Sequence, residues 1–274
     1  MPTVNKLSFS DVVSESFRFF FGHIRLFFHL VTIPWLASLA IRFIAASLRG
    51  DEDDSSVLSL AEKMLDVVPT VMFLVGWTRV VLLGPHRIDM LPGLGWSRRE
   101  TAFLIHLIKI AGVTYLLVAA FTYIIGPMDP LAFAVVSNDP DIARRQALAA
   151  PLGAGFIVSA LLALRVSYGL AASAVDVPFS PRLSWAYGKG NGWTILGTLF
   201  LMFFINAIVT TLAVVLTAAV LRGFLGSGLG VAVVVWTVAL LVSYAGAALV
   251  ITTQAIMFRR LVQWREGAAL SPPP

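Results

Sequence analysis

The sequence predicts an all-α integral membrane bundle of about six transmembrane helices, and three observations support this prediction. Only 13% of the 274 residues are charged and 58% are hydrophobic, whereas a soluble domain carries about 25% charged residues. Apolar runs recur from end to end, each long enough to supply the roughly 20 residues that cross a bilayer core. Basic residues gather at the ends of these runs, where lipid headgroups lie. A soluble domain of this length is therefore excluded.

The first element predicted is an amphipathic helix from residue 8 to about residue 22. Ser8 followed by Asp11 fits an N-terminal capping box. One helical face is apolar and the opposite face is polar. These faces carry, respectively, Phe9, Val12, Val13, Phe20, Ile24 and Phe27, and Asp11, Ser14, Glu15, Arg18 and Arg25. We expect residues 1–23 to form a cytoplasmic interfacial helix in the headgroup plane, with packing against the protein's own bundle as the alternative.

The apolar runs then give the expected spans in order. They cover residues 24–47, 65–83, 101–125, 151–175, 193–221 and 229–258. A short amphipathic segment at 56–64 precedes the second span, and a polar connection at 127–150 follows the third. The last two runs are long enough to cross the bilayer at a tilt. Residues 259–274 are expected to form a disordered cytoplasmic tail.

The distribution of basic residues predicts the orientation. If the N-terminus is cytoplasmic, the cytoplasmic side carries Lys6, Arg18, Arg25, Arg87, Arg98, Arg99, Arg182, Lys189, Arg259, Arg260 and Arg265. The other side carries Arg42, Arg49, Lys63, Arg144, Arg145 and Arg222, interleaved with most of the acidic residues. This bias predicts that both termini are cytoplasmic, which requires an even number of spans.

An internal repeat is consistent with that count. Residues 16–23 and 184–191 both read Ser-aromatic-x-aromatic-x-x-Gly-polar, and both lead into a predicted span. Both would lie on the same membrane face, as a parallel repeat demands. Residues 95–100 resemble a degenerate third copy. The alternative is chance similarity between aromatic-rich membrane interfaces.

Several kinds of chemistry are excluded or disfavoured. The chain has no cysteine, which excludes disulfides and thiolate ligands or nucleophiles. The four histidines show no metal-ligand spacing, and no nucleophile or nucleotide-binding motif occurs. We therefore predict no enzyme activity, no catalytic residue, no metal and no cofactor. The net charge of +5 is explained by lipid anchoring, so no nucleic acid partner is predicted.

Polar residues inside the runs are the remaining candidates for a site. Arg165 lies near the middle of the fourth predicted span, where a charge is costly and should face protein or water. Asn206, Gln254 and Lys109 complete the candidate intramembrane polar set. Arg165 either holds the bundle together or lines a path for an anionic solute or lipid. The candidate interfacial lipid contacts are Arg18, Arg25, Trp185, Lys189 and Trp193.

Two segments carry a resemblance to a known family. Residues 165–168 read Arg-Val-Ser-Tyr, and residues 184–193 read Ser-Trp-Ala-Tyr-Gly-Lys-Gly-Asn-Gly-Trp before a predicted span. This pattern resembles the six-span membrane domain associated with glycerophosphoryl diester phosphodiesterases and related bacterial inner-membrane proteins. The chain departs from it by lacking the threonine expected near Tyr187 and the proline expected after Arg165. The resemblance implies a fold and a bacterial inner-membrane location. It implies no activity, because no chemistry is assigned to that membrane domain.

The function expected from the sequence is that of a non-enzymatic accessory or scaffolding subunit of a membrane complex, or of an envelope-organising factor. Its expected partners are membrane lipids, including anionic headgroups, and either another membrane protein or a second copy of the chain. A small transporter or channel that uses Arg165 is the alternative. A lipid-acting membrane enzyme ranks third.

Overall fold

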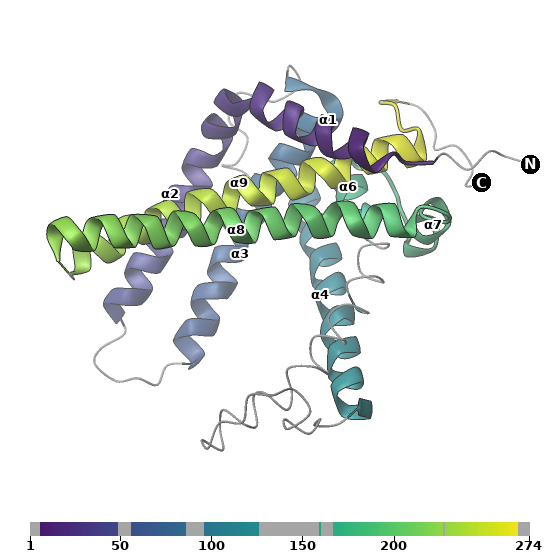
Figure 1. Cartoon of the computed structure of the whole chain (residues 1–274). Helices are drawn as coiled ribbons and strands as arrows, with labels where there is room; N and C mark the ends of the chain where they lie inside the picture. The colour runs from purple at the N-terminus through teal and green to yellow at the C-terminus, as the bar shows by residue number, and fades with distance from the viewer. Residues whose placement is uncertain are drawn as a thin grey trace, which may run out of the picture.

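The computed structural model describes residues 6–48, 56–85, 96–125, 159, 167–226 and 228–267. The elements in this part of the chain are all helices, which confirms the predicted all-α class (Figure 1). They are α1 (Phe9–Gly22), α2 (Ile24–Leu48), α3 (Ser56–Leu83), α4 (Arg98–Ile125), α6 (Tyr168–Ala174), α7 (Pro181–Tyr187), α8 (Gly192–Leu225) and α9 (Leu229–Val262).

Within the described ranges, 5 helices are long and apolar enough to cross a membrane. The candidate spans are Ile24–Leu48, Val57–Leu83, Arg98–Phe121, Gly192–Phe224 and Gly230–Val262. The fourth predicted span, residues 151–175, falls mostly outside the described residues, and α6 is its described end. The chain is therefore a multi-pass membrane protein.

Several helices extend beyond the predicted bounds, and the extensions of α3 and α9 take in segments that were predicted to be separate. The segment at 56–64 is continuous with the second span in α3, because no glycine or proline interrupts the chain before Pro69. Residues 259–262 of the predicted tail belong to α9. That helix ends where Gln263 adopts a left-handed conformation (φ 52°) and the Trp264 N–H donates to the Arg259 carbonyl at 3.1 Å. Residues 259–262 are helical because no residue before Gln263 interrupts the backbone hydrogen bonds of α9.

Aromatic side chains form the centre of the core, where α1, α2, α3 and α9 meet. Trp77 of α3 is fully buried. Its ring makes edge contacts with Phe20 and Phe27 and stacks on Phe73, with centroid distances of 6.0, 6.0 and 6.4 Å. Rings of this size dominate packing contacts between helices. This cluster holds the four helices around one point.

Helices α8 and α9 form a long antiparallel hairpin that runs across the view in Figure 1, whereas α4 runs down it. Helix α1 lies along the last turns of α9, so the first described residues and the last ones share one end of the molecule. We call this the terminal end, and we call the end with the α8–α9 turn the hairpin end. Helix α6 also lies at the terminal end, beside the start of α4, where Asp176 forms an ion pair with Arg99.

The first copy of the predicted repeat lies in the last turns of α1 and the turn into α2, and the second copy lies in α7 and the turn into α8. Each consists of a short helix, α1 or α7, followed directly by a long one, α2 or α8. The first serine of each copy, Ser16 or Ser184, is fully buried. The Leu7 N–H, nine residues before the first copy begins, donates to Asn191 Oδ1 of the second copy at 2.8 Å. The internal repeat itself stays a prediction.

Candidate functional site

A group of polar side chains lies between three of the candidate spans. Ser38 and Arg42 come from α2, Asp66 and Thr70 from α3, and Tyr244 from α9. We call these five residues the interhelical polar cluster. Polar and charged side chains inside a membrane are rare and face one another or the bundle interior. The cluster is therefore a candidate functional site.

Tyr244 is the centre of the uncharged half of the cluster. Its hydroxyl shares a hydrogen bond with Ser38 at 2.8 Å and a longer one with Thr70 at 3.4 Å. The Thr70 hydroxyl also donates to the Asp66 carbonyl at 2.8 Å. Both Ser38 and Tyr244 are buried. These bonds join all three helices, which is a packing role.

In the charged half of the cluster, Arg42 and Asp66 do not form a hydrogen bond with each other. Arg42 and Asp66 approach to 3.8 Å between Nη2 and Oδ2, with side chains 36% and 24% exposed. This distance exceeds that of a hydrogen bond. Arg42 Nε and Asp66 Oδ1 are buried atoms without a hydrogen-bond partner. Arginine and carboxylate pair best through two parallel bonds, so the pair retains unused donor and acceptor capacity.

An apolar groove of about 330 Å³ lies between α2 and α3. It is lined by Ile33, Pro34, Ala37, Ile41, Leu65, Val68, Pro69 and Met72. Both prolines lie inside their helices. Ile41 and Leu65 are the chain neighbours of Arg42 and Asp66. The ion pair therefore lies next to a surface that suits an acyl chain.

The terminal end is closed by a second set of polar contacts. Glu15 of α1 forms ion pairs with Arg259, at 2.6 Å, and with Arg260. One turn along, the Thr253 hydroxyl donates to Ser16 Oγ at 3.0 Å, and both residues are fully buried. Val12, Ser16 and Phe20 of α1 are buried, so the helix packs against the bundle, which was the alternative prediction for this segment. Whether it also lies in the headgroup plane stays a prediction.

Other polar groups near the terminal end also bond one helix to another. The Trp77 indole N–H donates to the Ala248 carbonyl at 3.1 Å and to the Thr252 hydroxyl at 2.8 Å. Arg79 donates to the Ala174 carbonyl at 3.3 Å. Burial raises the pKa of the Tyr187 phenol above its ordinary value of 10.0, which keeps it neutral. These groups stabilise the fold.

The predicted intramembrane polar residues do not form one site. Arg165 lies outside the described residues. Asn206 of α8 packs against Gly246 of α9 and accepts a hydrogen bond from Thr210 at 3.3 Å. Gln254 is buried, with its Oε1 lacking a hydrogen-bond partner. Lys109 is exposed on α4. No hydrogen bond or ion pair joins the three that the structure describes.

The predicted lipid contacts are all exposed, and those on α7 and at the start of α8 lie at the terminal end. Arg18 and Arg25 lie on α1 and α2, and Trp185, Lys189 and Trp193 lie on α7, the turn after it and the start of α8. Exposed basic and aromatic side chains at one end of a bundle are typical of a membrane interface. Their contact with lipid stays a prediction.

Sequence reasoning missed the interhelical polar cluster. Arg42 counted only as a charge flanking the first span, although it lies inside the predicted run 24–47, and Asp66 lies inside 65–83. Two opposite charges inside neighbouring apolar runs were the available signal. Tyr244 gave none, because a tyrosine in an apolar run is commonly interfacial.

Within the described residues, no group of three or more His, Asp or Glu side chains could hold a metal ion. In comparisons with family models, curated proteins and solved structures, nothing matches this chain. The resemblance to the phosphodiesterase-associated membrane domain therefore stays a prediction.

Proposed function

We propose that this chain is a non-enzymatic integral membrane protein that acts as an accessory or scaffolding subunit of a larger membrane complex, or as an envelope-organising factor. The observation that carries the proposal is the unequal burial of its spans. Half of the most apolar window of α3 is buried (50%), whereas the figure for α8 is 11%. A helix that its own chain covers so little is available to other molecules in the membrane.

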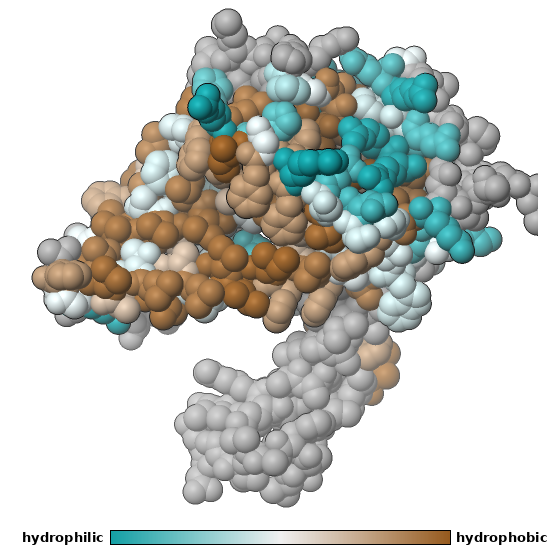
Figure 2. Space-filling view, turned by 45° about the horizontal axis from the view of Figure 1, so that its top comes forward, coloured by the Kyte–Doolittle hydropathy of each residue, from teal (hydrophilic) through white to brown (hydrophobic). Residues whose placement is uncertain are grey.

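The exposed side of α8 is large and apolar. It carries Phe200, Phe203, Phe204, Ile208, Val209, Leu212, Val215, Leu216 and Val220. Figure 2 shows brown, apolar residues toward the left, the side of the hairpin end, and teal, hydrophilic ones toward the right, the side of the terminal end. In lipid, helices associate through close packing of such faces. A neighbouring transmembrane helix is a suitable occupant.

The length of α8 is a second argument for a partner. Its 34 residues span about 51 Å at 1.5 Å per residue, and the hydrocarbon core is about 30 Å thick. A single helix meets this mismatch by tilting or by associating with other helices. Packing against a partner subunit would give the exposed length of α8 a protein surface along which to lie.

The polar groups inside the spans support a non-enzymatic role. Trp77, Thr253 and Tyr244 each bond one helix to another. A transport path or a catalytic centre needs polar groups that face a solute. Most of the described ones face the chain itself.

The location belongs to the same proposal. We place the protein in a bacterial inner membrane with both termini in the cytoplasm, on the strength of the basic residues gathered at the terminal end. The resemblance to the six-span family supports the same location.

Site-specific photo-crosslinking tests the proposal. A photoreactive phenylalanine analogue replaces Phe204 on α8, and the matched control replaces Phe43 on α2, because their exposed fractions are 55% and 52%. In native membranes, we expect Phe204 to yield one discrete protein adduct and Phe43 to yield lipid adducts. Lipid adducts alone at both positions would contradict a subunit role.

Transport of an anionic solute is the second candidate, and the open Arg42–Asp66 pair is the observation that favours it. The test is solute flux in proteoliposomes. Arg42→Met should abolish an anion flux that depends on this pair. Equal flux in the variant and the wild type would remove the cluster from any transport path.

A further inference from the structure

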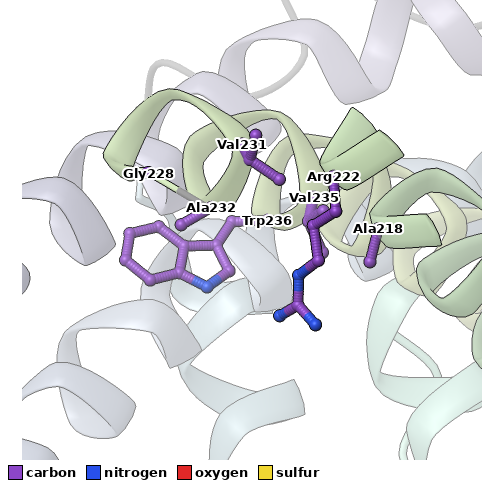
Figure 3. A pocket seen from close by; sticks show the side chains of 7 residues that line it. All are labelled: Ala218, Arg222, Gly228, Val231, Ala232, Val235 and Trp236. Atoms are coloured by element: carbon purple, nitrogen blue, oxygen red, sulfur yellow. The ribbon is translucent and has the colours of Figure 1, made fainter. Parts of the chain in front are cut away.

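A cavity of about 320 Å³ lies at the hairpin end, between the last turns of α8 and the first turns of α9. It is lined by Ala218, Arg222, Gly228, Val231, Ala232, Val235 and Trp236 (Figure 3). This volume is at the lower end of the range for small-molecule sites. None of the candidate residues named from the sequence lines it.

Among the described residues, the side chains that line the cavity offer hydrogen-bond donors and no acceptor. Arg222 supplies a guanidinium and Trp236 an indole N–H, and the other lining side chains are apolar or absent. Figure 3 shows both side chains directed toward the same side of the hairpin. Neither makes a hydrogen bond or an ion pair with any described residue. Their complement is an oxyanion.

The surroundings of this donor pair are apolar. Val231, Val235 and Ala218 form the walls of the cavity. The indole of Trp236 also lines a second groove, of about 260 Å³, whose other walls are Leu36, Leu39, Ala40, Phe43 and Val233. A molecule with an anionic head and apolar chains fits a donor pair between two apolar surfaces. A free phosphate ion would leave both surfaces uncovered.

The charge of the site narrows the class of lipid. The described part of the lining contains one cation and no carboxylate. A zwitterionic headgroup would bring its own ammonium group beside Arg222 with no acid to receive it. An anionic headgroup, such as phosphatidylglycerol, brings only the phosphate and neutral hydroxyls. Arginine and tryptophan are also the residues that anchor helices at the headgroup level.

We propose that the hairpin-end cavity is a binding site for one anionic phospholipid. Its phosphate accepts hydrogen bonds from Arg222 and from the indole N–H of Trp236, and an acyl chain follows the apolar walls. Arg222 also lies in the last turn of α8, where a cation stabilises the helix dipole. If Arg222 only stabilised the helix dipole, the protein would not select one lipid over another. Lipid selectivity therefore distinguishes a lipid-binding role of Arg222 from a role limited to the dipole.

The experiment uses the full chain in nanodiscs that contain phosphatidylcholine and a minor fraction of phosphatidylglycerol. Native mass spectrometry counts the lipids that stay bound to each chain. The wild type should retain one phosphatidylglycerol in preference to phosphatidylcholine. Arg222→Met should lower that retention by about ten-fold, as expected for the loss of a charge-assisted hydrogen bond. Trp236→Phe, which keeps the apolar wall, should lower it by a smaller factor.

Lys63→Met is the matched control, because Lys63 is an exposed cation outside this cavity. It should retain phosphatidylglycerol as the wild type does. Soluble glycerol 3-phosphate, added in excess, should not displace the lipid, because it lacks acyl chains. If Arg222→Met fails to fold, the retention of phosphatidylglycerol by Arg222→Lys and by Trp236→Phe tests the proposal instead.

Three results would overturn the proposal. The wild type could retain both lipids equally, Arg222→Met could retain phosphatidylglycerol as well as Lys63→Met does, or glycerol 3-phosphate could displace the lipid. The first two results would leave Arg222 with its dipole role alone. The third would identify a free phosphate site.

Discussion

The two helices of the α8–α9 hairpin have similar hydropathy and different surroundings. The mean hydropathies of the two spans are 2.5 and 2.2. At the terminal end, all side chains of α9 from Ile251 to Phe258 are buried. At the hairpin end, Val234 and Phe224 are exposed, and Arg222 has no partner among the described residues.

The difference shows what covers each half of the hairpin. The terminal half of α9 is covered by the protein's own helices, because α1, α3 and α6 pack around it, whereas Trp193 and Phe200 in the same half of α8 are exposed. The hairpin half leaves apolar surface to the membrane. Substitutions near the terminal end should therefore change stability, and substitutions near the hairpin end should change associations.

The largest effect expected is that of Trp77→Ala. Trp77 is fully buried and bonds to α9 through two hydrogen bonds. Its removal should lower the free energy of unfolding by about 3–5 kcal/mol, the range for aromatic-to-alanine changes in a core. Phe204→Ala on exposed α8 is the control and should change stability by less than about 0.5 kcal/mol. Equilibrium unfolding in mixed micelles measures both, and equal losses would break the comparison.

Gly246→Ala should have the next largest effect. A Cβ at Gly246 would lie 1.6 Å from Asn206 Oδ1 and 2.0 Å from its Cγ, so the α8–α9 contact must rearrange. We expect a loss of about 1–3 kcal/mol, as for other overpacked positions.

Two variants test the cause of that loss. The double variant Gly246→Ala with Asn206→Ala should recover most of it, because the clashing atoms are gone. Gly223→Ala near the hairpin end, where a Cβ meets nothing within 4 Å, should be neutral or slightly stabilising. Failure of the double variant to recover stability would place the strain elsewhere.

Glu15→Gln tests how firmly α1 is held at the terminal end. It removes the carboxylate that both Arg259 and Arg260 contact. Because the two arginine side chains are 41% and 36% exposed, solvent screens the pairs, and the loss should be about 1 kcal/mol. The exposed Asp11→Asn on the same helix is the control. High salt should shrink the gap between the two variants, and an unchanged gap would mean that charge is not the cause.

The smallest effect expected is that of Ser16→Ala. It removes the acceptor of the Thr253 hydroxyl, whose other hydrogen bond is to the Leu249 carbonyl. Hydrogen bonds between transmembrane helices contribute about 0.6 kcal/mol on average. Ser14→Ala, at an exposed position on the same helix, should change nothing. A double cycle with Thr253→Ala that gives no coupling would show that the bond contributes nothing.

The sequence predicts helices here better than it predicts contacts. Ser8 caps α1, since its Oγ accepts from the Asp11 N–H at 3.4 Å, and the run 24–47 matches α2 within a residue. Asn206 was named only as a candidate intramembrane polar residue, and in the structure it fills the space that Gly246 leaves. Contacts of this kind depend on the rotation of each helix about its axis. A helix that is apolar all round does not specify that rotation.

The interhelical polar cluster was missed for the same reason. Arg42, Asp66 and Tyr244 are far apart in the chain, and only the packing of α2, α3 and α9 brings them together. The hydropathy of α8 and α9 likewise does not predict that the two helices are buried to different extents. What the sequence predicts is which segments enter the membrane, and what the structure adds is which of their faces are occupied.

The most direct test is the oxygen accessibility of single spin labels along the hairpin, in purified protein in lipid nanodiscs. The chain has no cysteine, so each introduced thiol is the only label site. Ala207 and Ala219 on α8 are exposed, and Ala248 and Ala255 on α9 are fully buried, which gives matched alanine-to-cysteine changes. High collision rates at the first pair and low rates at the second are expected. Equal rates at all four positions would contradict the difference between a membrane-facing α8 and a covered terminal half of α9.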